Sequence, residues 1–233
     1  MPARAPHRAA RLLLTTAFAS IALAGALAAC GDVSWAPPAT PVTGAGDAQI
    51  EDRTTGAFTR VSVGSGIKVV VGNAEETKVT LEAQSNVLPL ITTTIVDGQL
   101  VVNTSAPGFT TSQAVTITIK APVIDSLAIS GGSTGFFEST SDTLNLDVSG
   151  GATLTGIGTA KDVTLTTSAG SKADLAQLQA TNAKVSMSDG SSATMTVSGS
   201  VTGTASGGST LALTQAPSSN GVQTSGGASV QVP

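Results

Sequence analysis

Six short runs of small residues in the second half of the chain determine the expected fold. The first is Ser130-Gly131-Gly132-Ser133. The others follow at regular intervals and are Ser149-Gly150-Gly151-Ala152, Ser168-Ala169-Gly170-Ser171, Ser188-Asp189-Gly190-Ser191, Ser206-Gly207-Gly208-Ser209 and Ser225-Gly226-Gly227-Ala228. Their first serines are separated by 19, 19, 20, 18 and 19 residues. A fixed period near 20 residues is typical of a solenoid, in which each repeat forms one rung and stacks on its neighbours.

Apolar residues flank these turns at fixed distances, which a low-complexity Gly/Ser tract would not show. Three residues before the first serine stand Leu127, Leu146, Leu165, Val185, Gly203 and Val222, and one residue before it stand Ile129, Val148, Thr167, Met187, Ala205 and Thr224. Seven residues after it stand Phe137, Gly156, Leu175, Met195, Leu213 and Val232. Alternate residues of a strand face the same side, so each rung is expected to hold two short strands with their apolar side chains inward. The sequence therefore predicts an all-β fold, a parallel β-helix with rungs of about 19 residues over about residues 124–233.

The first half of the chain has the period-2 alternation of half-buried strands. Val61 and Val63 alternate with polar residues, as do Val115, Ile117 and Ile119, and Asp97-Gly98 between two apolar runs is a signal for a two-residue hairpin turn. The chain contains 61 Ser plus Thr, 26 Gly and only 3% aromatic residues, a composition that disfavours a helical bundle. We expect residues 49–233 to form one domain in which the first half continues the β-helix.

At this level of detail the chain resembles a known family. The ordered array of turns, preceded by Phe58, Ile67-Lys68-Val69 and Asp97-Gly98-Gln99-Leu100, is similar to the head GIN domain family of auto-transporter adhesins over about residues 50–232. The resemblance implies a right-handed β-helix and a role in adhesion, and it carries no catalytic or ligand-binding residues with it. Ala169 and Asp189 replace a turn glycine, so we expect those two turns to differ in shape from the others.

The N-terminus is typical of an exported lipoprotein. Arg4, Arg8 and Arg11 precede an uncharged apolar run from Leu12 to Ala29, which has the pattern of a secretory signal. Leu27-Ala28-Ala29-Cys30 resembles a bacterial lipobox, and this resemblance implies that residues 1–29 are removed and that Cys30 is lipidated. Residues 30–48 are rich in Pro and Gly and read as a flexible linker between the lipid anchor and the domain.

Removing the signal peptide changes the charge and the chemistry of the chain. Three of the 11 basic residues precede Cys30 and all 15 acidic residues follow it, so the mature chain has eight basic residues, fifteen acidic residues and a net charge of −7. This charge disfavours nucleic acid, which is bound through basic patches. The only His, His7, lies in the removed segment and the only Cys is Cys30. Catalysis by Ser-His-Asp or Cys-His groups and zinc binding by His or Cys are therefore excluded.

Carboxylate chemistry has little support in the repeat. Glycoside hydrolysis requires two carboxylates close together, but Asp142, Asp147, Asp162, Asp174 and Asp189 all occupy different offsets from their turns. Only Asp189 lies within a turn, so a ladder of calcium sites is not expected. Asp142 and Lys161 share one offset on adjacent rungs, which predicts a surface ion pair.

These observations predict a non-catalytic lipoprotein of the cell envelope, without a cofactor or metal, that acts as an adhesin or interaction module. Its expected location is the extracytoplasmic face of the cell membrane, to which lipidated Cys30 attaches it. A surface glycan and an envelope protein are both open as partners. Two alternatives remain at this stage: a β-helix that binds or processes glycans, and a structural spacer without a ligand.

Overall fold

The structure is a computed structural model that describes residues 40–105 and 108–233. These residues form eighteen strands and one short 3₁₀ helix, η1 (Leu88–Leu90), and contain no α-helix. The strands are β1 (Val42–Thr43), β2 (Ala48–Arg53), β3 (Arg60–Val63), β4 (Lys68–Asn73), β5 (Lys78–Gln84), β6 (Ile91–Val96), β7 (Gln99–Thr104), β8 (Phe109–Thr110), β9 (Thr116–Ala121), β10 (Ser126–Ile129), β11 (Thr134–Val148), β12 (Thr153–Thr167), β13 (Lys172–Met187), β14 (Ser192–Val197), β15 (Ser200–Ala205), β16 (Thr210–Leu213), β17 (Ser219–Thr224) and β18 (Ser229–Gln231). The all-β prediction is confirmed.

The strands form a β-solenoid with two walls. The first wall runs β6-β7-β3-β10, then through the second halves of β11, β12 and β13 to β15 and β17. The second wall runs β2-β5-β9-β4, then through the first halves of β11, β12 and β13 to β14, β16 and β18. In the first wall, every pair of neighbouring strands from β3 through to β17 is parallel. The same holds in the second wall from β4 through to β18, as predicted.

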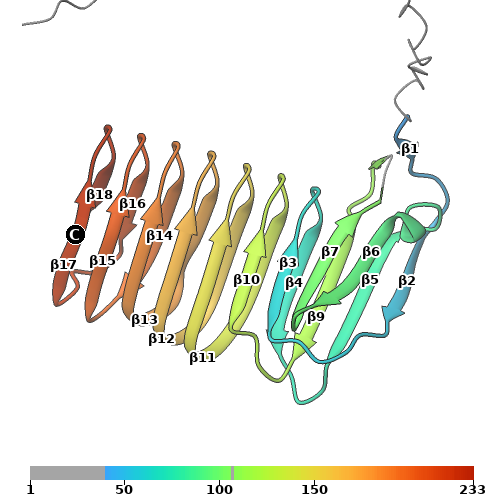
Figure 1. Cartoon of the computed structure of the whole chain (residues 1–233), viewed down its shortest axis with the longest axis horizontal. Coiled ribbons are helices and arrows are strands. Elements are labelled where there is room, and N and C mark those ends of the chain that lie inside the picture. The colour runs from blue at the N-terminus through green and yellow to red at the C-terminus, as the bar shows by residue number, and fades with distance from the viewer. Residues whose placement is uncertain (1–39, 106–107) are drawn as a thin grey trace, which may run out of the picture. The chain divides into compact units, whose positions relative to one another are not determined.

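Two kinds of turn connect the walls, and they lie on opposite sides of the solenoid (Figure 1). The tight turns are the six predicted Gly/Ser runs. The wide bends are the segments in which β11, β12 and β13 cross from the second wall back to the first, near residues 139–142, 158–161 and 178–181. A β-strand rises about 3.3 Å per residue, so each long strand spans one wall, one bend and the opposite wall.

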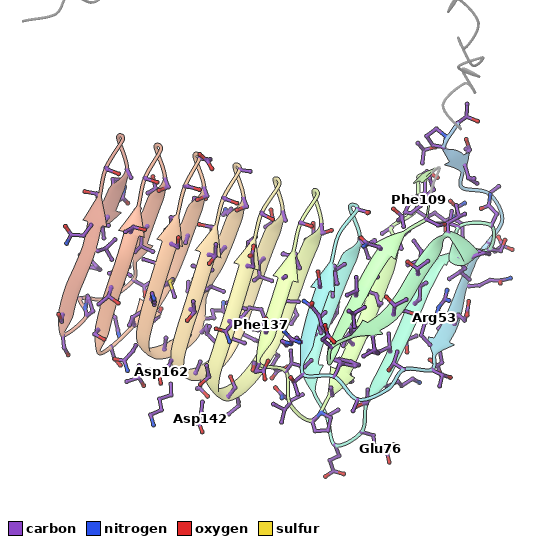
Figure 2. All side chains as sticks on the ribbon, in the orientation of Figure 1. Arg53, Glu76, Phe109, Phe137, Asp142 and Asp162 are labelled. Atoms are coloured by element: carbon purple, nitrogen blue, oxygen red, sulfur yellow. The ribbon has the colours of Figure 1, made fainter. Side chains whose placement is uncertain are left out.

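The predicted inward positions form the core between the walls. Leu165 of β12 is fully buried and is in register with Leu146 of β11 and Val185 of β13. Phe137 points into the same core from the second wall (Figure 2), and it is in register with Gly156, whose lack of a side chain leaves room for the ring. Because each side chain packs on its equivalents one rung away, the apolar stripe is buried by stacking.

The first half of the described chain extends the stack. Gly64-Ser65-Gly66-Ile67 joins β3 to β4 and forms a seventh tight turn, since β3 pairs with β10 and β4 pairs with β11. Ser65 and Gly66 have φ values of 66° and 71°, which match the other turns. This turn was not predicted from the sequence, because residues 74–125 separate it from the periodic array.

An antiparallel cap closes the stack next to β7 and β9. The predicted hairpin at Asp97-Gly98 joins β6 to β7, and β5 lies antiparallel between β9 and β2. β1 pairs with β8, so part of the segment expected to be a linker forms a short parallel ladder with the domain. Antiparallel strands at the end of a parallel stack cover the core with a different hydrogen-bonding pattern.

The expectation that Ala169 and Asp189 change the shape of their turns is wrong. Their φ values are 51° and 54°, close to the 57–60° of the glycines at the equivalent position of the other predicted turns. The amide of each following glycine donates to the next turn, from Gly170 to the carbonyl of Asp189 at 2.9 Å and from Gly190 to that of Gly207 at 2.8 Å. These inter-rung hydrogen bonds hold both residues in the left-handed conformation that a side chain normally disfavours.

Candidate functional site: a groove along the wide bends

A hollow of the described surface lies along the wide bends. It has a volume of about 580 Å³ and crosses successive rungs. Its lining residues are Thr140, Ser141, Asp142, Thr159, Ala160, Lys161, Gln179, Ala180, Thr181 and Ser198. We call this hollow the bend groove. It runs along the axis of the solenoid because equivalent residues of neighbouring bends are stacked in register.

Small residues form the floor of the bend groove. Ser141 is in register with Ala160, which is in register with Ala180. Both alanines are only 5% exposed, so their methyl groups close the core beneath the groove without filling the space above it. A larger side chain at these positions would occupy the hollow.

Polar side chains form the two rims. One rim consists of Thr140, Thr159 and Gln179, which are in register and exposed. The other consists of Asp142, Lys161, Thr181 and Ser198, which are also exposed. The groove therefore presents hydroxyl, amide, carboxylate and ammonium groups above an alanine floor.

The predicted ion pair between Asp142 and Lys161 does not form. The register brings the two residues to the same level of adjacent rungs, because their neighbours Ser141 and Ala160 are paired. The two ion pairs of the described residues lie elsewhere: Arg53 with Glu51 at 3.4 Å and Lys78 with Asp52 at 3.3 Å. Exposed ion pairs gain little energy in water, which explains why the matching register does not hold these two side chains together.

A second hollow of about 330 Å³ continues the bend groove toward the cap. It shares Thr140, Ser141 and Asp142 with the bend groove and adds Asn73, Pro122, Val123, Ile124, Asp125 and Thr143. Asn73 fixes this region, since its amide donates to the carbonyl of Pro122 at 3.2 Å and its Oδ1 accepts the amide N–H of Thr140 at 3.4 Å. Val123 is 53% exposed and adds an apolar surface at this end.

Side-chain hydrogen bonds tie successive rungs together beside the bend groove. Asn182 donates to the carboxylate of Asp162 at 2.9 Å and accepts the amide N–H of Ser200 at 3.2 Å. These bonds link three consecutive rungs beside the groove. Figure 2 shows Asp142 and Asp162 projecting from the wide-bend side of the solenoid.

Other polar groups lie away from the bend groove. Asp52 on β2 accepts a hydrogen bond from the hydroxyl of Thr80 at 2.9 Å, and this bond, together with Lys78, lowers the pKa of the Asp52 carboxyl. Within residues 40–105 and 108–233, no three His, Cys, Asp or Glu side chains are grouped so that they could hold a metal ion. No helix in this part of the chain is long and apolar enough to cross a membrane.

The predicted lipidation site, Cys30, lies outside the described residues, as does the signal peptide. The bend groove was not predicted from the sequence. The sequence signal for the groove is that the equivalent bend residues Ser141, Ala160 and Ala180 are all small. This signal is visible only when the bends are aligned as well as the tight turns.

Comparison with known proteins identifies the family. A profile of the family described as "Putative auto-transporter adhesin, head GIN domain" matches residues 57–217. The chain belongs to this family. The resemblance seen in the turn array is therefore confirmed, and the matched range contains all of the bend groove.

Solved structures share the fold of this head GIN domain protein at low sequence identity. "A putative adhesin" from Bacteroides fragilis has 14% identity and a TM-score of 0.66, over 82% of this chain and 100% of that one. One from Parabacteroides merdae has 14% identity and a TM-score of 0.53, over 84% and 100%. A "putative lipid binding protein" from Parabacteroides distasonis has 9% identity and a TM-score of 0.52, over 83% and 100%. Comparison with curated proteins finds no matching sequence.

Proposed function

We propose that this head GIN domain protein is an exported, non-catalytic adhesin that is attached to the extracytoplasmic face of the membrane by a lipid on Cys30. Its solenoid presents the bend groove to a partner outside the cell. The observation that carries the binding role is the bend groove itself, in which exposed polar side chains of successive rungs line one continuous hollow in a protein of an adhesin family.

The sequence supports the lipid anchor. Leu27-Ala28-Ala29-Cys30 follows an uncharged apolar run, and the chain after residue 29 has a net charge of −7. A protein with this charge is repelled by anionic headgroups, so a covalent lipid is the available means of membrane attachment.

Two features favour binding over catalysis. Asp142 is the only carboxylate that lines the bend groove. Asp125 joins it in the adjoining hollow, but Asp142 is exposed to solvent, whereas a carboxyl that acts as a general acid at neutral pH is held in a desolvated site. The hydroxyls and charges on the rims likewise favour a polar ligand over the acyl chain of a lipid.

The anchor is tested with the full chain in the bacterium that produces it. Cys30→Ser removes the thiol to which a lipid is attached, so the variant is expected to lose labelling by radioactive palmitate. If its signal peptide is removed, it is also expected to leave the detergent phase in a Triton X-114 separation. The matched control is Ser34→Ala, which changes a nearby residue and keeps the lipobox. A Cys30→Ser protein that is still labelled would overturn the anchor.

The adhesin role is tested on the same cells. We expect a strain that lacks the protein to be retained less than the wild type on surfaces coated with envelope extract, and we expect the wild-type gene to restore retention. Protease added to intact cells should degrade the protein if the domain is exposed. Equal retention of the deletion strain and the wild type would refute adhesion.

A further inference from the structure

The chemistry of the bend groove indicates the class of its ligand. We propose that the groove binds an extended glycan of uncharged sugars, which lies along the solenoid axis and crosses several rungs. This inference rests on the proposed adhesin function and specifies its ligand.

The dimensions of the groove suit a short run of sugars. The bend groove and the adjoining hollow have volumes of about 580 and 330 Å³ and share residues 140–142. Sites for small molecules typically have about 300–1,000 Å³. Neighbouring rungs are about 4.8 Å apart, so equivalent rim residues repeat at short, regular intervals that a linear polymer can follow.

The rims offer the hydrogen-bonding groups that sugar hydroxyls need. Each sugar hydroxyl donates one hydrogen bond and accepts others. Asp142 is an acceptor and Lys161 is a donor, and neither has a hydrogen-bond or ion-pair partner within the described residues. Hydrogen bonds to charged groups are the stronger ones, so this pair is expected to contribute most of the binding energy.

The floor and the cap end complement the less polar faces of a sugar. Ala160 and Ala180 place methyl groups at the base of the groove, against which the C–H face of a pyranose ring can lie. At the cap end, the exposed side chain of Val123 extends this apolar surface into the adjoining hollow. A polar ligand with a weakly polar face fits this combination.

Charge argues against an anionic polymer. Among the described residues, Lys161 is the only cation that lines the bend groove, whereas Asp142 lines the groove, Asp125 lines the adjoining hollow and Asp162 lies beside the groove. Phosphate or sulfate groups require several basic residues. A peptide that binds by adding a strand needs a free sheet edge, and β12 and β13 are each paired with a rung on both sides.

The experiment uses the full lipoprotein in detergent micelles and isothermal titration calorimetry. The uncharged probes are oligosaccharides of glucose, mannose, galactose and N-acetylglucosamine with four to six sugars, and the anionic probes are polygalacturonate and heparin. At least one uncharged oligosaccharide should bind, and Asp142→Ala and Lys161→Ala should each weaken that binding by about tenfold or more.

Matched controls remove the same charges elsewhere. Asp147→Ala on the first wall and Lys172→Ala on the second wall lie outside the groove and should change affinity by less than about twofold. Circular dichroism melting curves should be unchanged in all four variants, because all four residues are exposed.

The outcomes separate this inference from the proposed function. The inference is overturned if no uncharged oligosaccharide binds, if only the anionic polymers bind, or if the control variants weaken binding as much as the groove variants do. If any of these results is found while the deletion strain still adheres poorly, the adhesin function stands with a different ligand. If the deletion strain adheres normally, the adhesin function itself fails.

Discussion

Replacing Leu165 by Asp tests the stacked core directly. The Leu165 side chain is fully buried between Leu146 and Val185, and losing its burial costs about 1.5–3 kcal/mol. Among the described residues no cation is buried at this level of the core, so the introduced carboxyl must be protonated in the folded state. A fully buried carboxyl has its pKa raised by up to about 3–5 units. Binding a proton at pH 7 to a group whose unfolded pKa is about 3.9 costs about 4 kcal/mol.

The two costs add to about 6–7 kcal/mol, which is comparable to the whole stability of a typical domain, about 5–15 kcal/mol. Leu165→Asp is therefore expected to unfold at much lower urea than the wild type when followed by far-UV circular dichroism. Because the folded state of the variant takes up a proton, its penalty should decrease as the pH is lowered from 7 toward 4.

Thr164→Asp is the matched control, because residue 164 points outward next to residue 165. Thr164 is exposed and lies in register between Asn145 and Lys184, so a new carboxylate there faces an amide and an ammonium group. Thr166 is a poorer control, since it is in register with Asp147 and would place two carboxylates side by side. The control should lie within about 0.5 kcal/mol of the wild type. Equal urea midpoints for Leu165→Asp and Thr164→Asp would refute the assignment of an inner and an outer face.

Two further predictions concern close backbone packing and surface charge. Gly203→Ala should lower the urea midpoint far more than Gly208→Ala, because a Cβ at residue 203 would lie 1.9 Å from the carbonyl oxygen of Val185 whereas one at residue 208 meets nothing within 4 Å. Both glycines have positive φ, so Gly208→Ala measures the conformational cost alone, about 1 kcal/mol, and similar losses for the two variants would contradict the close approach. Thr80→Val removes the hydrogen bond that does most to lower the pKa of Asp52, so this pKa should rise toward its usual value of 3.8 in an NMR titration. The Asp52 carboxylate adds stability above about pH 4, and this stability is lost as the pH falls through its lowered pKa. In Thr80→Val this contribution should be smaller. An unchanged pKa of Asp52 would contradict the assigned cause.

The repeat could be predicted from the sequence because its signals are local. The spacing of the tight turns and the apolar residues beside them fix which side chains point inward, and the burial of Leu146, Leu165 and Val185 follows from these offsets alone. The Asp97-Gly98 hairpin was predictable for the same reason, since two residues with positive φ determine the turn.

The remaining features depend on contacts between residues that are distant in the sequence. Gly64-Ser65-Gly66-Ile67 forms a tight turn, but the cap strands follow it and interrupt the period. Ala169 and Asp189 adopt the glycine conformation because hydrogen bonds from the neighbouring rungs hold them there. Neither effect has a signature in the residues themselves.

The bend groove was missed for a related reason. The offsets that identify the core are counted from the tight turns, whereas the groove lies on the opposite side of each rung. Its floor consists of the small residues Ser141, Ala160 and Ala180. Because small residues are common throughout this chain, these three do not stand out in the sequence. The register of Asp142 and Lys161 was predicted correctly, but their side-chain geometry was not, because exposed charges are weakly constrained.

The order of the rungs in space differs from their order in the sequence, and this has a consequence for folding. β3 and β4 lie between β7 and β9 on one side and β10 and β11 on the other, yet both neighbours come later in the chain. During synthesis, β3 therefore has no parallel partner until residue 104 has been made, and β4 has none until residue 121 has been made. The rungs from β12 onward each have a finished template when they emerge. Nucleation should thus be slow and confined to the capped half, with elongation proceeding quickly toward the C-terminus, as expected when contacts of long sequence separation must form first.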